Sequence, residues 1–453
     1  MTAIFPHRAP SRVALIICCV GLLAPGLATA TLWTIKPSVS ANIQHDDNLL
    51  LVAAPHKGVT WLSLAPHVDF TAAQSNWQLT GSGEWRARRY SGQSSLNGND
   101  QVYGLSSQYQ GERSVWQLGG SYAKEAVMAS STFSPDIGLS TAETTRITRS
   151  VNPSWTWLMS ERSKLELNYQ SGLVSYESQL SQLVNYTTRE GTATYLYQWT
   201  PRDQLAVLLD RSYFKTPQVT TSQLGHTAFY SDINGVFSLE PNPQELSNIS
   251  TTDSLTLGWT HTFSQTLNAA VSVGPSRTAA DTIIQTCAGS TSPQIYFVGG
   301  TIVGAATCTQ TTNTDYPRSS SGYLFNVGLN KKFLLTQVNL SAARQVTPSG
   351  TGTQAVVNSV TLGITHQISP RLTAVLSLSS YQMRSLDNTA ASYTDRNYAS
   401  GSANLAWKWT RQLTVQGGYL YIRQRFLSGD TAERDNAIFL KLAYGWQGFS
   451  ISR

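Results

Sequence analysis

The sequence predicts an all-β fold, a transmembrane antiparallel β-barrel of about 18 strands, and three observations lead to it. Apolar and polar residues alternate with a period of two along most of the chain, which is typical of strands whose two faces meet different solvents. A short turn pattern recurs between these segments. Only 13% of the residues are charged while 10% are aromatic, a balance that suits one face in lipid and the other in water.

The first 30 residues are typical of an export signal. Arg8 and Arg12 precede a mostly apolar run over residues 13–24, and Ala28-Thr29-Ala30 forms a small-residue cleavage site. We therefore expect residues 1–30 to be a cleaved signal peptide. Residues 31–453 are then the mature chain, which forms the barrel.

The mature chain contains no apolar stretch of the roughly 18 residues that a membrane-spanning helix needs, so a helical membrane protein is excluded. The formal net charge falls from +6 to +4 when the two signal arginines are removed, and the remaining charge is spread along the chain. This is too little and too diffuse to indicate a nucleic-acid partner. The expected location is the bacterial outer membrane, with membrane lipid as a partner.

Five turns share one sequence pattern. A Trp or His ends one segment, a few polar residues follow, and a Leu opens the next segment. Transmembrane barrels have short turns on the periplasmic side and aromatic rings at the membrane interface, so each copy predicts one periplasmic hairpin. The copies lie at residues 157–165, 199–205, 261–267, 366–372 and 409–413.

Counting outward from these hairpins gives eighteen strands, with sixteen as the alternative count, and an even number places both termini in the periplasm. A soluble sandwich or propeller also has short alternating strands. Its packed core would leave few of these Thr-, Ser-, Asn- and Gln-rich faces pointing inward. The predicted strands are 32–43, 60–70, 76–90, 101–110, 113–124, 145–159, 163–175, 186–199, 203–214, 253–263, 266–276, 321–330, 333–344, 356–368, 371–383, 396–409, 411–423 and 435–446.

Two motifs near the mature N-terminus resemble a known family. His45-Asp46-Asp47-Asn48 is followed by three leucines, and Leu62-Ser-Leu-Ala-Pro66 opens the second predicted strand. The chain thereby resembles the outer-membrane β-barrel porins that accompany exopolysaccharide synthesis and export systems. The resemblance covers the mature chain in architecture but only its N-terminal part in motif. It implies a barrel tied to surface polysaccharide, without a catalytic activity and without any residue of assigned function.

The side chains of Asp46, Asp47 and Asn48 by themselves predict a first extracellular loop that turns with their help, because Asp and Asn hydrogen-bond to nearby backbone. A calcium site is the alternative, although no spaced set of further oxygen ligands follows. We expect no metal or other cofactor, since no metal-binding motif occurs. His261 and His366 occupy the place that Trp takes in the other turn patterns, which indicates amphipathic rings at the interface.

A barrel of eighteen strands encloses a lumen wide enough to hold water. By geometry alone we therefore expect a pore, unless loops fold inward and close it. The resemblance implies exopolysaccharide export or the passage of saccharides, and small polar solutes are a further expected class. Two alternatives remain open, namely a non-conducting surface scaffold or binding barrel, and an outer-membrane hydrolase. The hydrolase is disfavoured because no nucleophile, base and carboxylate are singled out by their spacing and no GxSxG motif occurs, so we expect no catalytic residues.

Assigning faces strand by strand predicts which charged residues line the pore. Because the first and last strands are neighbours in a closed barrel, two of the lysines are expected at a similar depth, Lys36 near Trp33 and Lys441 near Trp446. The lumen should then have a positive side and favour anions, with Asp69 and Glu84 offsetting part of the charge. A purely structural network of paired charges is the alternative. The predicted pore-lining residues are Lys36, Glu84, Arg86, Arg88, Lys408 and Lys441.

The mature chain has two cysteines, Cys287 and Cys308, both in the long loop expected between the eleventh and twelfth strands. Because an exported protein passes through an oxidising periplasm, we predict a disulfide between them. Closing a loop of about 20 residues would stabilise the protein by about 3 kcal/mol in the chain-entropy model. Thiol labelling of the unreduced, denatured protein should find no free cysteine, and two labelled thiols would contradict the prediction.

Overall fold

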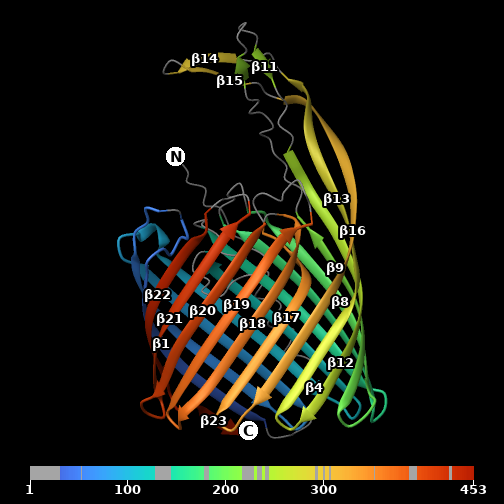
Figure 1. The fold of residues 1–453 in the computed structure, drawn as a ribbon, viewed down its shortest axis with the longest axis vertical. Coiled ribbons are helices and arrows are strands. Elements are labelled where there is room, and N and C mark those ends of the chain that lie inside the picture. The colour runs from blue at the N-terminus through green and yellow to red at the C-terminus, as the bar shows by residue number, and fades with distance from the viewer. Residues whose placement is uncertain are drawn as a thin grey trace, which may run out of the picture.

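The fold is a closed antiparallel barrel, seen here in a computed structural model (Figure 1). One sheet of 19 strands contains 18 that build the wall and a short one, β23 (Phe449–Ser452), at the seam. The expected signal peptide lies outside the described residues. The structure describes residues 31–52, 54–127, 144–177, 183–216, 229–231, 237–239, 244–290, 294–298, 301–305, 308–350, 352–386, 395–427 and 431–452.

Each of the eighteen expected strands overlaps one wall strand, so the count of eighteen is confirmed. The described residues also include one turn of 3-10 helix, η1 (Ser94–Leu96). They contain no helix that is long and apolar enough to cross a membrane. The wall strands are β1 (Leu32–Asp46), β2 (Val59–Ala73), β3 (Trp77–Tyr90), β4 (Gly98–Gln110), β5 (Ser114–Ala126), β6 (Thr145–Leu158), β7 (Ser163–Tyr176), β8 (Tyr186–Gln198), β9 (Asp203–Lys215), β12 (Gln244–Ser264), β13 (Leu267–Ser290), β16 (Cys308–Lys332), β17 (Thr336–Pro348), β18 (Gln354–Ser369), β19 (Leu372–Ser385), β20 (Arg396–Lys408), β21 (Leu413–Phe426) and β22 (Glu433–Gly445).

Three strands are much longer than expected. β12, β13 and β16 have 21, 24 and 25 residues and run past the mouth of the barrel (Figure 1). Beyond the barrel neither face of a strand meets lipid, so the sequence there loses its apolar alternation and resembles a loop. Four short strands complete two small hairpins, β10 (Phe229–Ser231) with β11 (Phe237–Leu239) and β14 (Gln294–Val298) with β15 (Thr301–Ala305).

This extension also corrects the setting of the two cysteines, which lie on β13 and β16 and not in a loop. The register opposes Cys287 to Thr311 and Cys308 to Ser290. Their side chains lie outside the described residues, so the disulfide stays a prediction.

The barrel closes where β1 meets the end of the chain. β1 pairs with β22 from Ser38 opposite Gly445 onward, and its first residues pair with β23. The break between the two partners lies beside Pro37, which has no N–H to donate. The carbonyl of Pro37 instead accepts a hydrogen bond of 3.1 Å from Trp446 N. A four-residue strand is too short to show alternation in the sequence, and β23 was not expected.

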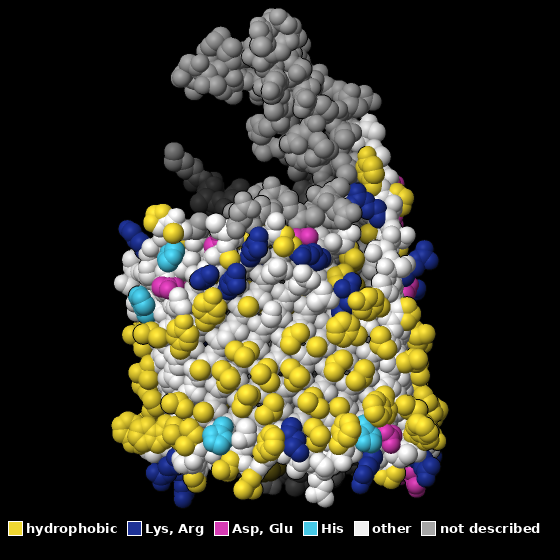
Figure 2. All heavy atoms as spheres, viewed as in Figure 1, with side chains coloured by type: hydrophobic (Ala, Val, Ile, Leu, Met, Phe, Trp, Pro, Cys, Tyr) yellow, Lys and Arg dark blue, Asp and Glu magenta, His cyan; other side chains and the backbone are white. Residues whose placement is uncertain are grey.

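Figure 2 shows an apolar belt on one face of the outer wall, and exposed large apolar side chains lie on each of the wall strands. On β12, for example, Leu255, Leu257 and Trp259 point outward and are 41%, 61% and 43% exposed. Such a belt on a closed sheet without free edges is what a bilayer requires. The protein is an outer-membrane β-barrel. Eight exposed tryptophans mark the end with the short turns, namely Trp33, Trp116, Trp157, Trp199, Trp259, Trp407, Trp409 and Trp446.

One hydroxyl explains the repeated turn pattern. In each of the five turns a Ser or Thr oxygen accepts hydrogen bonds from backbone N–H groups two or three residues later, which fixes the reversal of the chain. In the last copy, Thr410 Oγ1 accepts from Gln412 N at 3.2 Å and from Leu413 N at 2.9 Å. The five residues are Ser160, Thr200, Ser264, Ser369 and Thr410.

We expect Thr410→Val to lower the free energy of unfolding by about 1 kcal/mol, because valine keeps the shape and removes both turn hydrogen bonds. Urea unfolding of the protein from lipid vesicles measures this difference. Thr414→Val makes the same chemical change four residues later, on the strand itself, and serves as the control. Equal stabilities of the two variants would show that the hydroxyl does not hold the turn.

Candidate functional site

The inner wall between β2 and β8 is lined mainly by small polar side chains. Two adjoining hollows of about 560 Å³ and 270 Å³ lie on it. Ser106, Asn152 and Gln170 line both hollows, and Ser82 and Gln117 line one each. Hydroxyl and amide groups both donate and accept hydrogen bonds without carrying charge. The wall can therefore exchange hydrogen bonds with hydroxylated solutes.

Three of the predicted pore-lining residues follow one another along the inner face of β3 and belong to one ionic network. Arg86 Nη2 lies 2.5 Å from Glu84 Oε1, and its Nη1 lies 3.6 Å from Asp100 Oδ2 on β4. Arg88 Nη2 lies 2.5 Å from Asp100 Oδ1. The side chain of Arg88 is 2% exposed, whereas those of Arg86 and Glu84 are 31% and 26% exposed. Arg88 thus braces the wall, and Arg86 and Glu84 remain open to the water of the lumen.

The other three, Lys36, Lys408 and Lys441, also occupy inward positions, but the structure does not bring them together. Lys36 lies opposite Asp69 of β2, while Lys441 lies opposite Asn42, six residues further along β1. Six strand residues correspond to about 20 Å. The expectation of a similar depth for Lys36 and Lys441 is wrong, because the seam is staggered. Lys408 ends β20 at the side of the short turns.

The opposite wall carries carboxylates. β9 stands half-way around the barrel from β22, and Asp210 of β9 and Glu190 of β8 occupy inward positions there. Thr192 Oγ1 donates a hydrogen bond of 3.1 Å to Asp210 Oδ2. The side of the lumen with the three lysines is called the basic wall here, and the facing side with Asp210 and Glu190 the acidic wall. Two further carboxylates of the basic wall, Asp46 and Asp435 at its outer end, are buried.

At the extracellular end, two chain segments fold inward and narrow the lumen. The first is residues 47–52, directly after β1. Asn48 N donates to Asp435 Oδ1 at 2.9 Å, and the Asn48 side-chain amide donates to Arg434 O at 3.0 Å. The same side chain donates to Val52 O at 2.9 Å and accepts from Val52 N at 3.1 Å. These bonds turn the segment back on itself and fasten it to β22.

Asp47 adds a second attachment to β22. Its carboxylate accepts from Asn436 N at 2.8 Å and from Asn436 Nδ2 at 2.6 Å. Partial burial acts to raise the pKa of Asp47, but the hydrogen bonds from Asn436 outweigh it and hold that pKa below its ordinary value. A lowered folded-state pKa means that this stabilisation is present at neutral pH and is lost as the pH falls through the acid range. The Asp-Asp-Asn motif is thus a turn-forming element, as its side chains predicted.

The turn delivers Leu51 to an apolar patch on the inner wall. Leu51 has a φ of 48° and is 7% exposed. The rings of Tyr381 and Tyr398 stack within the patch, with centroids 4.4 Å apart. Burial of this patch, which would otherwise face water, favours the docked loop. Leu51 packs with Ala355, Val357, Tyr381, Met383, Tyr398 and Ile422, which come from β18 to β21.

The second inward segment is the turn between β17 and β18. Val184 N, in the connection between β7 and β8, donates to Gly350 O at 2.8 Å. Thr252 Oγ1 of β12 donates to Gln354 Oε1 at 3.0 Å. β8 and β17 are five steps apart in the sheet, so these contacts cross part of the mouth and do not join neighbours. Ser349, at the start of the turn, is 1% exposed.

A second apolar patch lies on the inner wall under this side of the mouth. It combines Val127 and Leu183, from the connections, with inward side chains of β7 to β9. The rings of Tyr186 and Phe214 lie 5.4 Å apart in it. Neither patch was predicted from the sequence, although the apolar residues at inward positions near the outer strand ends are a signal for them. The further members are Val174 and Tyr176.

No family model matches the sequence, and no curated protein matches it closely enough to count as a relative. Similar solved structures include the open form of the ferric-catecholate import receptor Fiu from E. coli K12, with a TM-score of 0.47, 9% identity, and coverage of 91% of this chain and 81% of the receptor. OccAB2 of Acinetobacter baumannii has a TM-score of 0.45 and 10% identity, and the match covers 92% of this chain and 98% of OccAB2. The structure of OpdK from Pseudomonas aeruginosa with vanillate has a TM-score of 0.43 and 9% identity, and the match covers 92% of this chain and 99% of OpdK. All three TM-scores are below 0.5, and no conclusion about solute or mechanism follows from them.

Within the described ranges, no group of three or more His, Cys, Asp or Glu side chains is arranged to hold a metal ion. The arrangement that the structure does show is a polar lumen with charged walls and a narrowed outer mouth.

We expect Leu51→Ala to release the first inward segment, because the substitution removes most of the side chain that fills the apolar patch. Single-channel conductance in planar bilayers should rise and become noisier. Leu49→Ala makes the same truncation two residues earlier, at a side chain outside the patch, and should leave the conductance unchanged. Identical traces from the two variants would show that residues 47–52 do not narrow the conducting path.

Proposed function

We propose that the protein is a porin-like channel of the outer membrane that passes small hydroxylated solutes, with saccharides as the solute class. The observation that carries the proposal is the inner wall of hydroxyl and amide groups with its two adjoining hollows. Each neutral hydrogen bond to a solute replaces one to water and contributes little net free energy. A row of such groups guides a solute without trapping it, as a channel needs. The resemblance to porins of exopolysaccharide systems supports the same solute class.

Current recordings with added oligosaccharide test this proposal. Sugar should block the open current of the native protein. Replacing Asn152 and Gln170 together by Leu should weaken the block, because both amides line the shared part of the hollows. The control replaces Gln337 and Asn339, an amide pair on the inner face of β17, by Leu. Equal block in both double variants would contradict the role of the hollows.

The narrowed mouth favours a second candidate, a barrel that binds a surface partner at its outer end and does not conduct. The contacts between Val184 and Gly350 and between Thr252 and Gln354 tie together wall segments that are not neighbours. Folded protein that gives no current in bilayers, with or without Leu51→Ala, would decide for this candidate.

Our proposal includes a selectivity role for the basic wall. Fixed charges of one sign in a confined channel raise the concentration of counter-ions, and the effect fades as salt screens it. Lys36 and Lys441 lie at different depths, so a permeating anion meets them in succession. Arg86 and Glu84 are paired and therefore contribute less.

We expect the native pore to prefer anions at low salt, and Lys36→Glu with Lys441→Glu to shift the preference towards cations. The reversal potential under a salt gradient measures this. Arg425→Glu makes the same kind of charge change at an exposed, outward position of β21 and should leave the reversal potential unchanged. A native pore that prefers cations would mean that the acidic wall dominates.

A further inference from the structure

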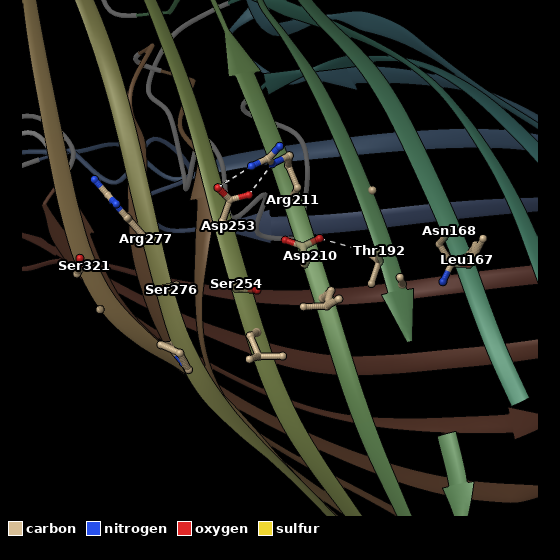
Figure 3. A pocket seen from close by; sticks show the side chains of 16 residues that line it. Leu167, Asn168, Thr192, Asp210, Arg211, Asp253, Ser254, Ser276, Arg277 and Ser321 are labelled. Atoms are coloured by element: carbon tan, nitrogen blue, oxygen red, sulfur yellow. Dashed lines mark hydrogen bonds and ion pairs between the residues drawn. The ribbon is translucent and has the colours of Figure 1, made fainter. Parts of the chain in front are cut away.

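The outer wall has a hollow of about 770 Å³ on its lipid-facing side, across β7 to β16 (Figure 3). Leu167, Ala193, Leu209 and Leu255 form one register row of outward side chains along its floor. The methyl group of Ala193 is short beside its leucine neighbours, and Pro275 continues the row on β13 with a compact ring. Short side chains between long ones leave a groove in a belt that is otherwise filled.

The backbone is irregular next to this groove. The ladder between β12 and β13 is interrupted between the pairs Ser254–Ser276 and Leu257–Val273, where Pro275 lacks a donor. A Cβ atom at Gly274 would stand 1.8 Å from Leu255 O, so the two strands approach as only glycine allows. The backbone beside the groove is therefore irregular, and Gly274 is required there for the close approach of the two strands.

A charged row borders the groove on the extracellular side. Arg211, Asp253 and Arg277 occupy consecutive strands in one register row, directly above the apolar floor. Arg211 binds Asp253 through two contacts, Nε to Oδ1 at 2.6 Å and Nη2 to Oδ2 at 3.0 Å, and the two side chains are 72% and 52% exposed. Charged side chains on the lipid face are tolerated near the interface and not at the bilayer centre. The row thus lies at the headgroup level of the outer leaflet.

The row carries more positive than negative charge. Asp253 forms an ion pair with Arg211, and the Arg277 guanidinium points away from both side chains (Figure 3). In the part of the chain that the structure describes, Arg277 makes no close ion pair with a carboxylate, and its charge acts on Asp253 only at longer range. By contrast, Arg344 on β17 is engaged with the protein, because it lies 4.7 Å above the Tyr323 ring and donates to a neighbouring amide. Arg277 is thus available to an anion from outside.

We propose that this wall binds one phosphorylated lipid of the outer leaflet, with a phosphate on Arg277 and Arg211 and an acyl chain in the groove. A guanidinium matches two phosphate oxygens at once, which makes arginine a strong phosphate ligand. The apolar floor lies on the membrane side of the charged row, just as the acyl chain of a lipid lies on the membrane side of its headgroup. The proposal concerns the outer face and is independent of conduction through the lumen.

Native mass spectrometry of the full chain in detergent tests the proposal, with lipid A carrying two phosphates as the probe. The native protein should retain one lipid, and the same lipid without phosphates should bind at least tenfold more weakly. Arg277→Ala should weaken retention at least tenfold through the headgroup, and Ala193→Phe should do so by filling the groove. Arg425→Ala removes an exposed outward arginine on the other side of the barrel and should retain the lipid.

Folding of each variant is checked by the faster migration of unheated barrels on gels, so a loss of retention is counted only for folded protein. Equal retention by the native protein, Arg277→Ala and Ala193→Phe would overturn the proposal. If the phosphate-free lipid bound as tightly as lipid A, the arginines would not bind the headgroup. If inorganic phosphate at the same concentration as the lipid displaced it, the groove would not bind the acyl chain. If the native protein were a dimer without lipid and the Ala193→Phe variant a monomer, the groove would be a contact with a second copy of the chain. That result would also overturn the lipid-binding proposal.

Discussion

The structure depends on one constraint, that lipid offers no hydrogen-bond partner to the backbone. Every N–H and C=O group at membrane depth must therefore be paired within the sheet, and the sheet must close. The seam between β1 and the chain end shows how strictly this applies. Where Pro37 cannot donate, β22 ends, Trp446 N pairs with the free carbonyl, and β23 takes over the remaining edge of β1.

Closure of the sheet fixes the two faces, and the period of two then assigns every side chain to lipid or to water. This is why the strands could be predicted: the alternation that identifies them is the same property that the bilayer selects. The repeated turns could be predicted for a related reason. A Ser or Thr at a fixed place provides a hydrogen-bond acceptor for the backbone where the sheet reverses, and aromatic rings beside it meet the interface.

The sequence did not predict the parts of the strands that lie outside the membrane, where the bilayer no longer requires alternation. β13 and β16 continue beyond the mouth, and there polar residues occupy both faces, so nothing distinguished a strand from a polar loop. The stagger at the seam was not visible either, because register across the closure is set by pairing between residues some four hundred positions apart. Alternation in the sequence places Lys36 and Lys441 on one face of their strands, whereas their relative depth depends on the register across the seam.

The narrowed mouth follows from a local exception to the inner-face rule. Most inward positions carry polar side chains because they meet water, and an apolar side chain there would expose its surface unless something covers it. Val357, Met383 and Ile422 are such exceptions on one wall, and Phe214 is one on the other. Each lies near the extracellular end of its strand, and each is covered by a residue from a connection, Leu51 on the first wall and Leu183 on the second. An inward apolar residue near the outer end of a barrel strand therefore marks where a connection folds against the inner wall, as Leu51 and Leu183 do on the two patches.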